Sequence, residues 1–141
     1  MVTEMNIDEL KRLLEGERGV VLGYLFGSHA MGLDGPLSDV DVAVFLNENM
    51  SKADRFELRL KLMARLSSAL RTGKVDVVVM NDASIVLNYE VIKHGRALVV
   101  RDRELKLDVE SRILSAYLDW MYYERRSLDE FLEGVIRREA L

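Results

Sequence analysis

Two apolar runs separated by a short polar segment constrain the fold of this 141-residue chain most strongly. Residues 20–26 and 40–46 are rich in aliphatic and β-branched side chains, as is typical of buried strands. The segment between them begins with Gly-Ser at 27–28 and leads, ten residues later, into Asp-Val-Asp at 39–41. We therefore predict two neighbouring strands joined by a turn, with two carboxylates at the entrance of the second strand.

Length and composition favour one domain and exclude several kinds of site. A chain of 141 residues with 49% hydrophobic residues can bury one core, so we expect a single domain over residues 1–141. The chain contains no cysteine, which excludes disulfides, thiolate metal ligands and cysteine nucleophiles.

The charge of the chain limits its partners. The net charge is −4 and the isoelectric point is near 5.3, whereas affinity for nucleic acid comes mainly from cationic side chains. No apolar stretch is long enough to cross a bilayer, and the first residues lack the order of a signal peptide. We therefore expect a cytoplasmic protein with no membrane partner and no direct nucleic-acid binding.

Helical periodicity predicts two helices around the apolar runs. Apolar residues recur at helical spacing over about residues 7–15, and Ser51 is placed to cap a second helix that ends near Gly73. We expect the apolar face of this second helix to consist of Phe56, Leu60, Met63, Ser67 and Leu70.

The second half of the chain continues the alternation of strands and helices. Residues 74–80 predict a third strand, Asn-Asp at 81–82 predicts the cap of a third helix that ends at Gly95, and residues 97–100 predict a fourth strand. The expected fold class is α/β (α+β), with a small mixed sheet of three to four strands flanked by helices.

A long apolar pattern near the C-terminus predicts a helical segment with two possible roles. Apolar residues follow helical spacing from Val109 to Val135, so the stripe could pack on the core of the chain itself. Part of this segment also mixes aromatic and basic side chains, as protein interfaces do. These side chains are Trp120, Tyr122, Tyr123, Arg125 and Arg126. We hypothesise that part of the helix contacts a partner protein.

Three carboxylates form a candidate metal site. Asp39 and Asp41 are two residues apart on a strand, so their side chains leave the same face. Two such acids repel unless a cation lies between them, and Mg²⁺ prefers hard oxygen ligands of this kind. Asp76 on the next strand could supply a third carboxylate, and three acids with a triphosphate can hold two metal ions.

The Gly-Ser pair adds a candidate phosphate site. Gly27 allows backbone N–H groups to approach a phosphate closely, and the Ser28 hydroxyl can donate a hydrogen bond to it. Each element has a simpler interpretation when taken alone: a Gly-Ser pair as a turn, and Asp76 as an exposed acid at the start of a strand. The combination of all of them favours a nucleotide site.

This combination resembles the nucleotidyltransferase superfamily that includes DNA polymerase beta. Within that superfamily the chain is most similar to the minimal, MNT-type antitoxins, which are paired with HEPN-domain toxins. Five residues match the signature position by position: Gly27, Ser28, Asp39, Asp41 and Asp76. The similarity to the minimal group extends over nearly the whole chain and includes residues 89–98.

The resemblance implies a nucleotidyltransferase fold and a role for each matching residue. Asp39 and Asp41 would bind both Mg²⁺ ions, and Asp76 would bind the catalytic ion and orient or deprotonate the acceptor hydroxyl. Gly27 and Ser28 would hold the β and γ phosphates of ATP. The implied reaction transfers AMP to a hydroxyl, that of a tyrosine, on a HEPN toxin and so silences it.

One departure from the signature favours a second function, and a third function is also open. Many members of the superfamily have a basic residue where this chain has Met31, so we expect a weaker hold on the triphosphate. One alternative is therefore a non-catalytic antitoxin that neutralises its toxin by binding alone. The other is a small-molecule nucleotidyltransferase, although such enzymes usually need a further domain to enclose their substrate.

Overall fold

A four-stranded mixed sheet organises the computed structural model, which describes residues 4–27 and 39–139. The strand order is β3-β2-β1-β4; β1 is antiparallel to both β2 and β4, whereas β2 and β3 are parallel. The elements are α1 (Glu4–Glu15), β1 (Val20–Phe26), β2 (Val40–Leu46), α2 (Lys52–Leu70), β3 (Val75–Val79), α3 (Ile85–His94), β4 (Arg96–Val100) and α4 (Arg103–Glu139). The predicted strands and fold class are confirmed.

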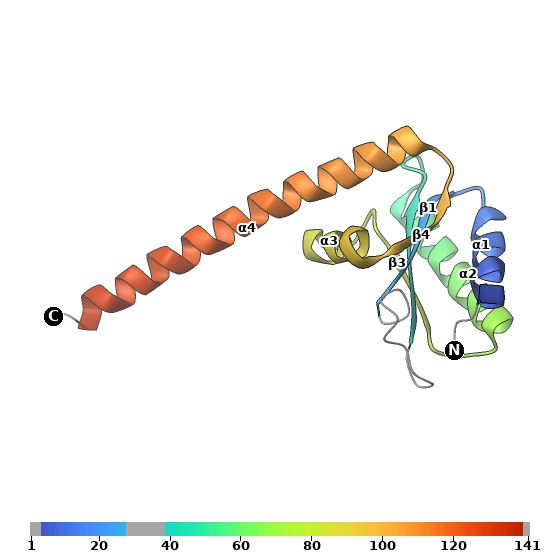
Figure 1. The fold of residues 1–141 in the computed structure, drawn as a ribbon, viewed down its shortest axis with the longest axis horizontal. Helices are drawn as coiled ribbons and strands as arrows, with labels where there is room; N and C mark the ends of the chain where they lie inside the picture. Colours follow the sequence, from blue (N-terminus) through green and yellow to red (C-terminus); the bar gives the residue numbers. More distant parts are fainter. Residues whose placement is uncertain (1–3, 28–38, 140–141) are drawn as a thin grey trace.

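Helices cover both faces of the sheet (Figure 1). On one face, α1 and α2 bury Leu10, Leu62 and Leu66 against the valines of β2 and β3. On the other face, α3 and the first turns of α4 contribute Val91 and Val109 to a second apolar cluster. Because side chains alternate along a strand, the even and odd positions of β2 and β3 face different helices.

The start of α2 is confirmed, but its predicted apolar face is wrong in part. The Ser51 hydroxyl accepts a hydrogen bond from the Asp54 backbone N–H, as an N-cap does. The buried residues of α2 are Leu62 and Leu66, whereas Phe56 and Leu60 are exposed. Apolar residues lie on more than one side of this helix, so packing against the sheet, and not periodicity, selects the buried side.

The start of α3 also differs from the prediction. Ser84, and not the Asn-Asp pair at 81–82, is the N-cap, because its hydroxyl accepts a hydrogen bond from the Leu87 N–H. The Asn81 side chain is used elsewhere, where it pairs with the backbone of Leu46 through two hydrogen bonds of 2.9 Å. The predicted end at Gly95 is confirmed.

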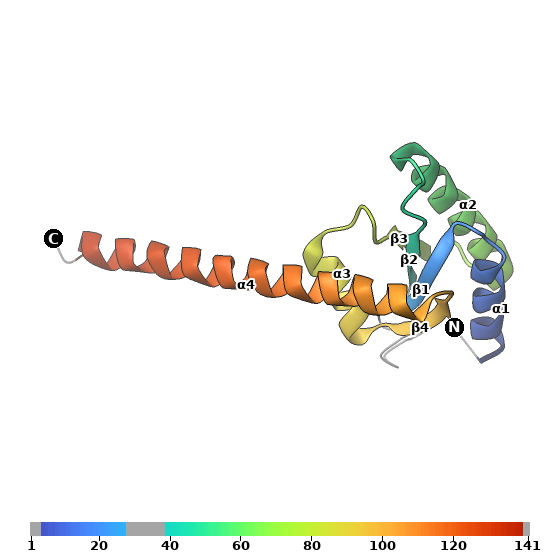
Figure 2. The same cartoon turned by 90° about the horizontal axis from the view of Figure 1, so that it is seen from above.

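The helix α4 has two parts with different surroundings. Its first part packs on the sheet and on α3: Val109 is buried, the Tyr24 hydroxyl donates to Glu110 over 2.9 Å, and the Tyr89 and Tyr117 rings stack. Its second part leaves the sheet and runs away from the other elements (Figures 1 and 2). Every residue from 118 to 133 is exposed, so packing on the core is wrong for this part of the stripe.

Within residues 4–27 and 39–139, no helix combines the length and apolarity that a membrane span requires.

Candidate functional site

The candidate site lies at the end of the sheet where β1 finishes and β2 and β3 begin. Phe26 pairs with Asp41 across β1 and β2, and Asp41 pairs with Asp76 across β2 and β3. Paired residues of neighbouring strands project to the same face, which here is the face covered by α3 and α4. The sheet therefore brings Asp41 and Asp76, 35 residues apart in the sequence, to adjacent positions.

Gly27 lies directly against the Asp41 carboxylate. A Cβ atom built at Gly27 would approach Asp41 Oδ2 to 2.5 Å, and its φ of +76° is one that side chains rarely adopt. Both observations require glycine at this position. The backbone after β1 can therefore approach the carboxylate in a way that any larger residue would prevent.

The structure defines the positions of the other predicted site residues less fully. Asp39 lies one residue before β2 and is exposed. The common face with Asp41 that alternation predicts stays a prediction. Ser28 and Met31 lie outside the described residues. Their roles stay predictions.

Arg59 is a neighbour of the site that sequence reasoning missed. It lies on α2 and reaches the edge of β3, where its Nε donates to the Val77 carbonyl over 2.6 Å and its Nη2 is 3.3 Å from Asp76 Oδ1. Asp76 is half exposed, so this ion pair is weak. The spacing of Lys52, Phe56 and Arg59, at i, i+4 and i+7, is the sequence signal that could have identified this face of α2.

The donor chemistry of the site fits Mg²⁺, although the described residues gather no three ligands at one point. Asp41 and Asp76 offer carboxylate oxygens from one face, and such hard ligands suit Mg²⁺ together with substrate phosphates. In the described part of the chain, no group of three His, Cys, Asp or Glu side chains is arranged to hold a metal ion. A bound triphosphate would have to supply the remaining oxygen ligands.

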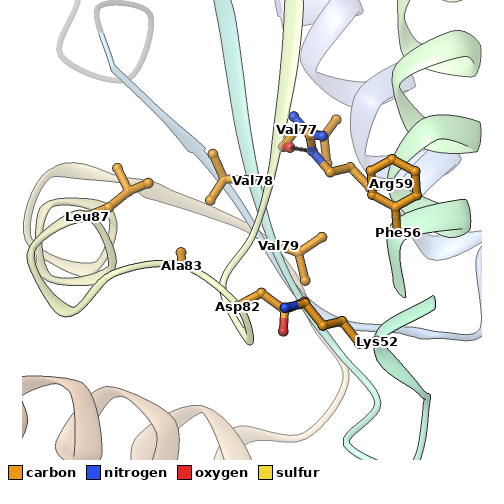
Figure 3. Close-up of a pocket in the computed structure, with 9 residues that line it drawn as sticks. All are labelled: Lys52, Phe56, Arg59, Val77, Val78, Val79, Asp82, Ala83 and Leu87. Carbon is orange, nitrogen blue, oxygen red and sulfur yellow. Dashed lines mark hydrogen bonds between the residues drawn. The ribbon is translucent and has the colours of Figure 1, made fainter. Parts of the chain in front are cut away.

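A cavity of about 320 Å³ lies along the outer edge of β3 (Figure 3). It runs between α2 and the segment that leads into α3. Its lining residues are Lys52, Phe56, Arg59, Val77, Val78, Val79, Asp82, Ala83 and Leu87.

The acid in this cavity is already paired. Arg55 Nη2 is 2.7 Å from Asp82 Oδ1, and Arg55 Nε donates to Asp82 Oδ2 over 2.9 Å. The hydrogen bonds from Arg55 lower the pKa of the Asp82 carboxyl from its ordinary value. Arg59 is paired in turn with Asp76, so Lys52 leaves the lining with a net positive charge.

Comparison with known sequences identifies a family and one relative. The profile of the family described as "Polymerase beta, Nucleotidyltransferase" matches residues 8–104. A Shewanella oneidensis protein named protein adenylyltransferase MntA is 35% identical over 89 residues. The matched segment is 63% of this chain and 60% of that protein, so it spans less than two thirds of the relative's length.

Comparison with solved structures finds the same architecture in toxin–antitoxin complexes. A chain from a crystal structure of a toxin–antitoxin with AMP-PNP has a TM-score of 0.71 and 27% identity, and the match covers 92% of this chain and 98% of that one. A chain from a structure of a tri-AMPylated Shewanella oneidensis HEPN toxin in complex with an MNT antitoxin has a TM-score of 0.70 and 25% identity, with the same coverage.

Proposed function

Because the chain belongs to the polymerase beta nucleotidyltransferase family, we propose that it is an antitoxin that transfers AMP from ATP to a HEPN toxin. The acceptor is a hydroxyl group, that of a tyrosine. The relatives support this proposal, since one is named a protein adenylyltransferase and another occurs in complex with an AMPylated HEPN toxin.

The register between β2 and β3 is the observation that carries the proposal. It places Asp41 beside Asp76, and Gly27 lies against the Asp41 carboxylate from the opposite side. An enzyme that transfers a nucleotidyl group needs a phosphate site, a metal site and an acceptor site in a row. Gly27, Asp41 and Asp76 form such a row across three adjacent strands.

Each residue then has a distinct role. Gly27 and Ser28 would hold the β and γ phosphates, while Asp39 and Asp41 would hold two Mg²⁺ ions and Asp76 would hold one of them. The metal ions, when bound, neutralise charge on the phosphates and favour departure of pyrophosphate. Asp76 orients the acceptor hydroxyl toward the α-phosphorus for attack in line with the leaving group.

The exposed part of α4 is the proposed binding surface for the toxin. Exposed apolar patches on a protein commonly mark interaction sites, and aromatic residues are enriched in them. Nine large apolar side chains between residues 118 and 136 are 38–67% exposed. We further propose that residues 1–141 act as one domain and that the protein works in the cytoplasm, where its substrate ATP is available.

A labelling experiment tests the transfer reaction. The protein is mixed with α-labelled ATP, Mg²⁺ and the candidate HEPN toxin, and the double variant Asp39→Ala with Asp41→Ala is compared with wild type. We expect label on the toxin only with wild type. The matched control, Asp8→Ala with Glu9→Ala, removes two acids from α1 on the opposite face of the sheet and should label normally.

Two results would contradict the proposal. Label that survives the double substitution would overturn the role of the acids. Tight complex formation without any label would instead support an antitoxin that acts by binding alone, which the exposed surface of α4 also permits.

A further inference from the structure

The contact between Arg59 and Asp76 crosses the free edge of the sheet. Asp76 pairs with Asp41, and its side chain projects to the face that α3 and α4 cover. Arg59 belongs to α2, which covers the opposite face. Because β3 stands at the end of the strand order, the arginine side chain can reach around this edge to the carboxylate.

The guanidinium group of Arg59 is held by a bond that does not involve the acid. Its Nε donates to the Val77 carbonyl of this edge strand over 2.6 Å (Figure 3). Since the guanidinium group is planar, a bond at Nε also sets the direction of Nη2, which lies 3.3 Å from Asp76 Oδ1. The arginine therefore presents one N–H group to one oxygen of the carboxylate.

A neighbouring arginine on the same helix forms a different kind of pair. Arg55 donates through Nε and Nη2 to both oxygens of Asp82, so that carboxylate is fully engaged. Asp76 meets Arg59 through Oδ1 alone, and in the described part of the chain no hydrogen bond reaches its Oδ2. The second oxygen of Asp76 is therefore available to a substrate.

Stability alone does not account for this contact. Asp76 is half exposed, and ion pairs at such positions contribute little to the free energy of unfolding. A half-exposed carboxylate can rotate about its side-chain bonds, whereas a reacting group must lie within about 0.5 Å of its productive position. Arg59 limits this rotation because it fixes one of the two oxygens.

From these observations we propose that Arg59 is a positioning residue, which fixes Oδ1 of Asp76 so that Oδ2 is directed at the acceptor hydroxyl. This inference rests on the proposed function and adds a residue to it. In this role Arg59 touches neither ATP nor the acceptor and acts only through Asp76. Its removal should therefore slow transfer without weakening the binding of ATP.

Steady-state kinetics of AMP transfer to the candidate toxin separate positioning from binding. We expect Arg59→Gln to lower kcat about 10- to 100-fold, as loss of a group that orients a ligand of the reaction does. The KM for ATP should change less than about twofold. Arg65→Gln is the matched control, because it removes another arginine of α2, which pairs with Glu17, and should leave both constants unchanged.

The conservative variant Arg59→Lys separates orientation from charge. Lysine keeps the positive charge, but its single nitrogen cannot contact Val77 and Asp76 as the planar fork of arginine does. We therefore expect this variant to recover only part of the rate that Arg59→Gln loses.

A double-mutant cycle shows whether Arg59 acts through Asp76. In the background of Asp76→Asn, Arg59→Gln should slow transfer by less than about a further twofold, because residues that act together have non-additive effects. Single-turnover measurements with α-labelled ATP give the rates of the slow variants.

Nuclear magnetic resonance of the protein without toxin or nucleotide tests the contact itself. We expect the Arg59 Nε–H resonance to shift in Asp76→Asn, while the Arg55 Nε–H resonance, whose partner is Asp82, stays in place. The same spectra show that each variant is folded. This readout does not depend on activity, so it distinguishes failure of the contact from failure of the proposed function.

Four outcomes would overturn the inference. One is a wild-type rate in Arg59→Gln or Arg59→Lys, and another is an equal fall of kcat in Arg65→Gln. A full effect of Arg59→Gln in the Asp76→Asn background would show that the arginine acts elsewhere, and an unchanged Arg59 resonance would show that the contact does not form. If the wild-type protein transfers no AMP, the proposed function fails and the positioning role with it, even where the resonance shifts.

Discussion

The end of the sheet that carries Gly27, Asp41 and Asp76 and the exposed part of α4 differ in how their residues are held. At the sheet, strand pairing determines the relative positions of the acids, and Gly27 tolerates no added atom. Along α4, residues 118–133 are all exposed and their positions follow from the helix alone. The positions of the site residues therefore depend on close contacts between strands, whereas the exposed part of α4 provides a large accessible surface.

The proposed function assigns a different task to each of these two regions. Chemistry at phosphorus needs atoms within a few tenths of an ångström of their productive positions, which paired strands supply. Binding of a partner needs apolar area and a few anchoring side chains, which a long exposed helix supplies. Substitutions at the sheet should therefore change the rate of transfer, and substitutions on α4 should change affinity.

The largest expected effect comes from Asp41→Asn. The substitution keeps the shape of the side chain but removes the charge that would hold a metal ion, so we expect AMP transfer to fall about 100- to 1000-fold. Binding of the toxin, measured by calorimetry, should stay within a factor of about two. A loss of binding equal to the loss of transfer would break the separation of the two regions.

Gly27→Ala should have the next largest effect. A Cβ atom would meet Asp41 Oδ2 at 2.5 Å, and the positive φ adds backbone strain of about 1–3 kcal/mol. We expect transfer to fall about tenfold or more in a labelling assay. Gly73→Ala is the matched control, because nothing lies within 4 Å of a Cβ there. Equal effects at the two glycines would contradict the proposed close contact.

On α4, Phe131→Glu should weaken binding of the toxin at least about tenfold, because a charge would replace an apolar anchor. Phe131 is 65% exposed, so the melting temperature should not change. Leu107→Glu is a control on the same helix, with 66% exposure but next to the sheet. Equal affinities of the two variants would show that the exposed part of α4 is not the binding surface.

The smallest effect is expected where the first part of α4 meets β1, at the hydrogen bond that the Tyr24 hydroxyl donates to Glu110. Tyr24→Phe should lower the free energy of unfolding at pH 7 by about 1 kcal/mol in urea denaturation. Tyr122→Phe, at an exposed position, should leave the stability unchanged.

The same pair predicts a dependence on pH. Burial, and then the hydrogen bond to Glu110, raise the pKa of Tyr24 from its ordinary value of 10.0. The stabilisation is therefore complete below pH 10 and is lost as the pH rises above it, because only the unfolded state ionises there. The difference between wild type and Tyr24→Phe should shrink above pH 10. A constant difference would show that Tyr24 ionises equally in both states.

Local patterns predicted much of this fold. The runs at 20–26 and 40–46 coincide with β1 and β2, because β-branched residues bounded by polar or glycine residues favour strands. The cap at Ser51 and the helix end at Gly95 were also identified, since both depend on neighbouring residues. The apolar face of α2 was not, because a helix with apolar residues on several sides is oriented only by what it packs against.

The candidate site was likewise predicted from the sequence only in part. Alternation along one strand predicts a common face for Asp39 and Asp41, and composition excludes cysteine chemistry. The contact of Arg59 with Asp76 joins α2 to β3, and the sequence contains no local rule that predicts such a pair.

Backbone propensity and side-chain alternation act over a few residues, so the strands, the helix ends and the spacing of the acids follow from the chain alone. Strand order, the cavity beside β3 and the exposure of α4 arise from competition between distant segments for burial. That competition is decided only when the whole chain packs, because the free energy of burial depends on which surfaces meet.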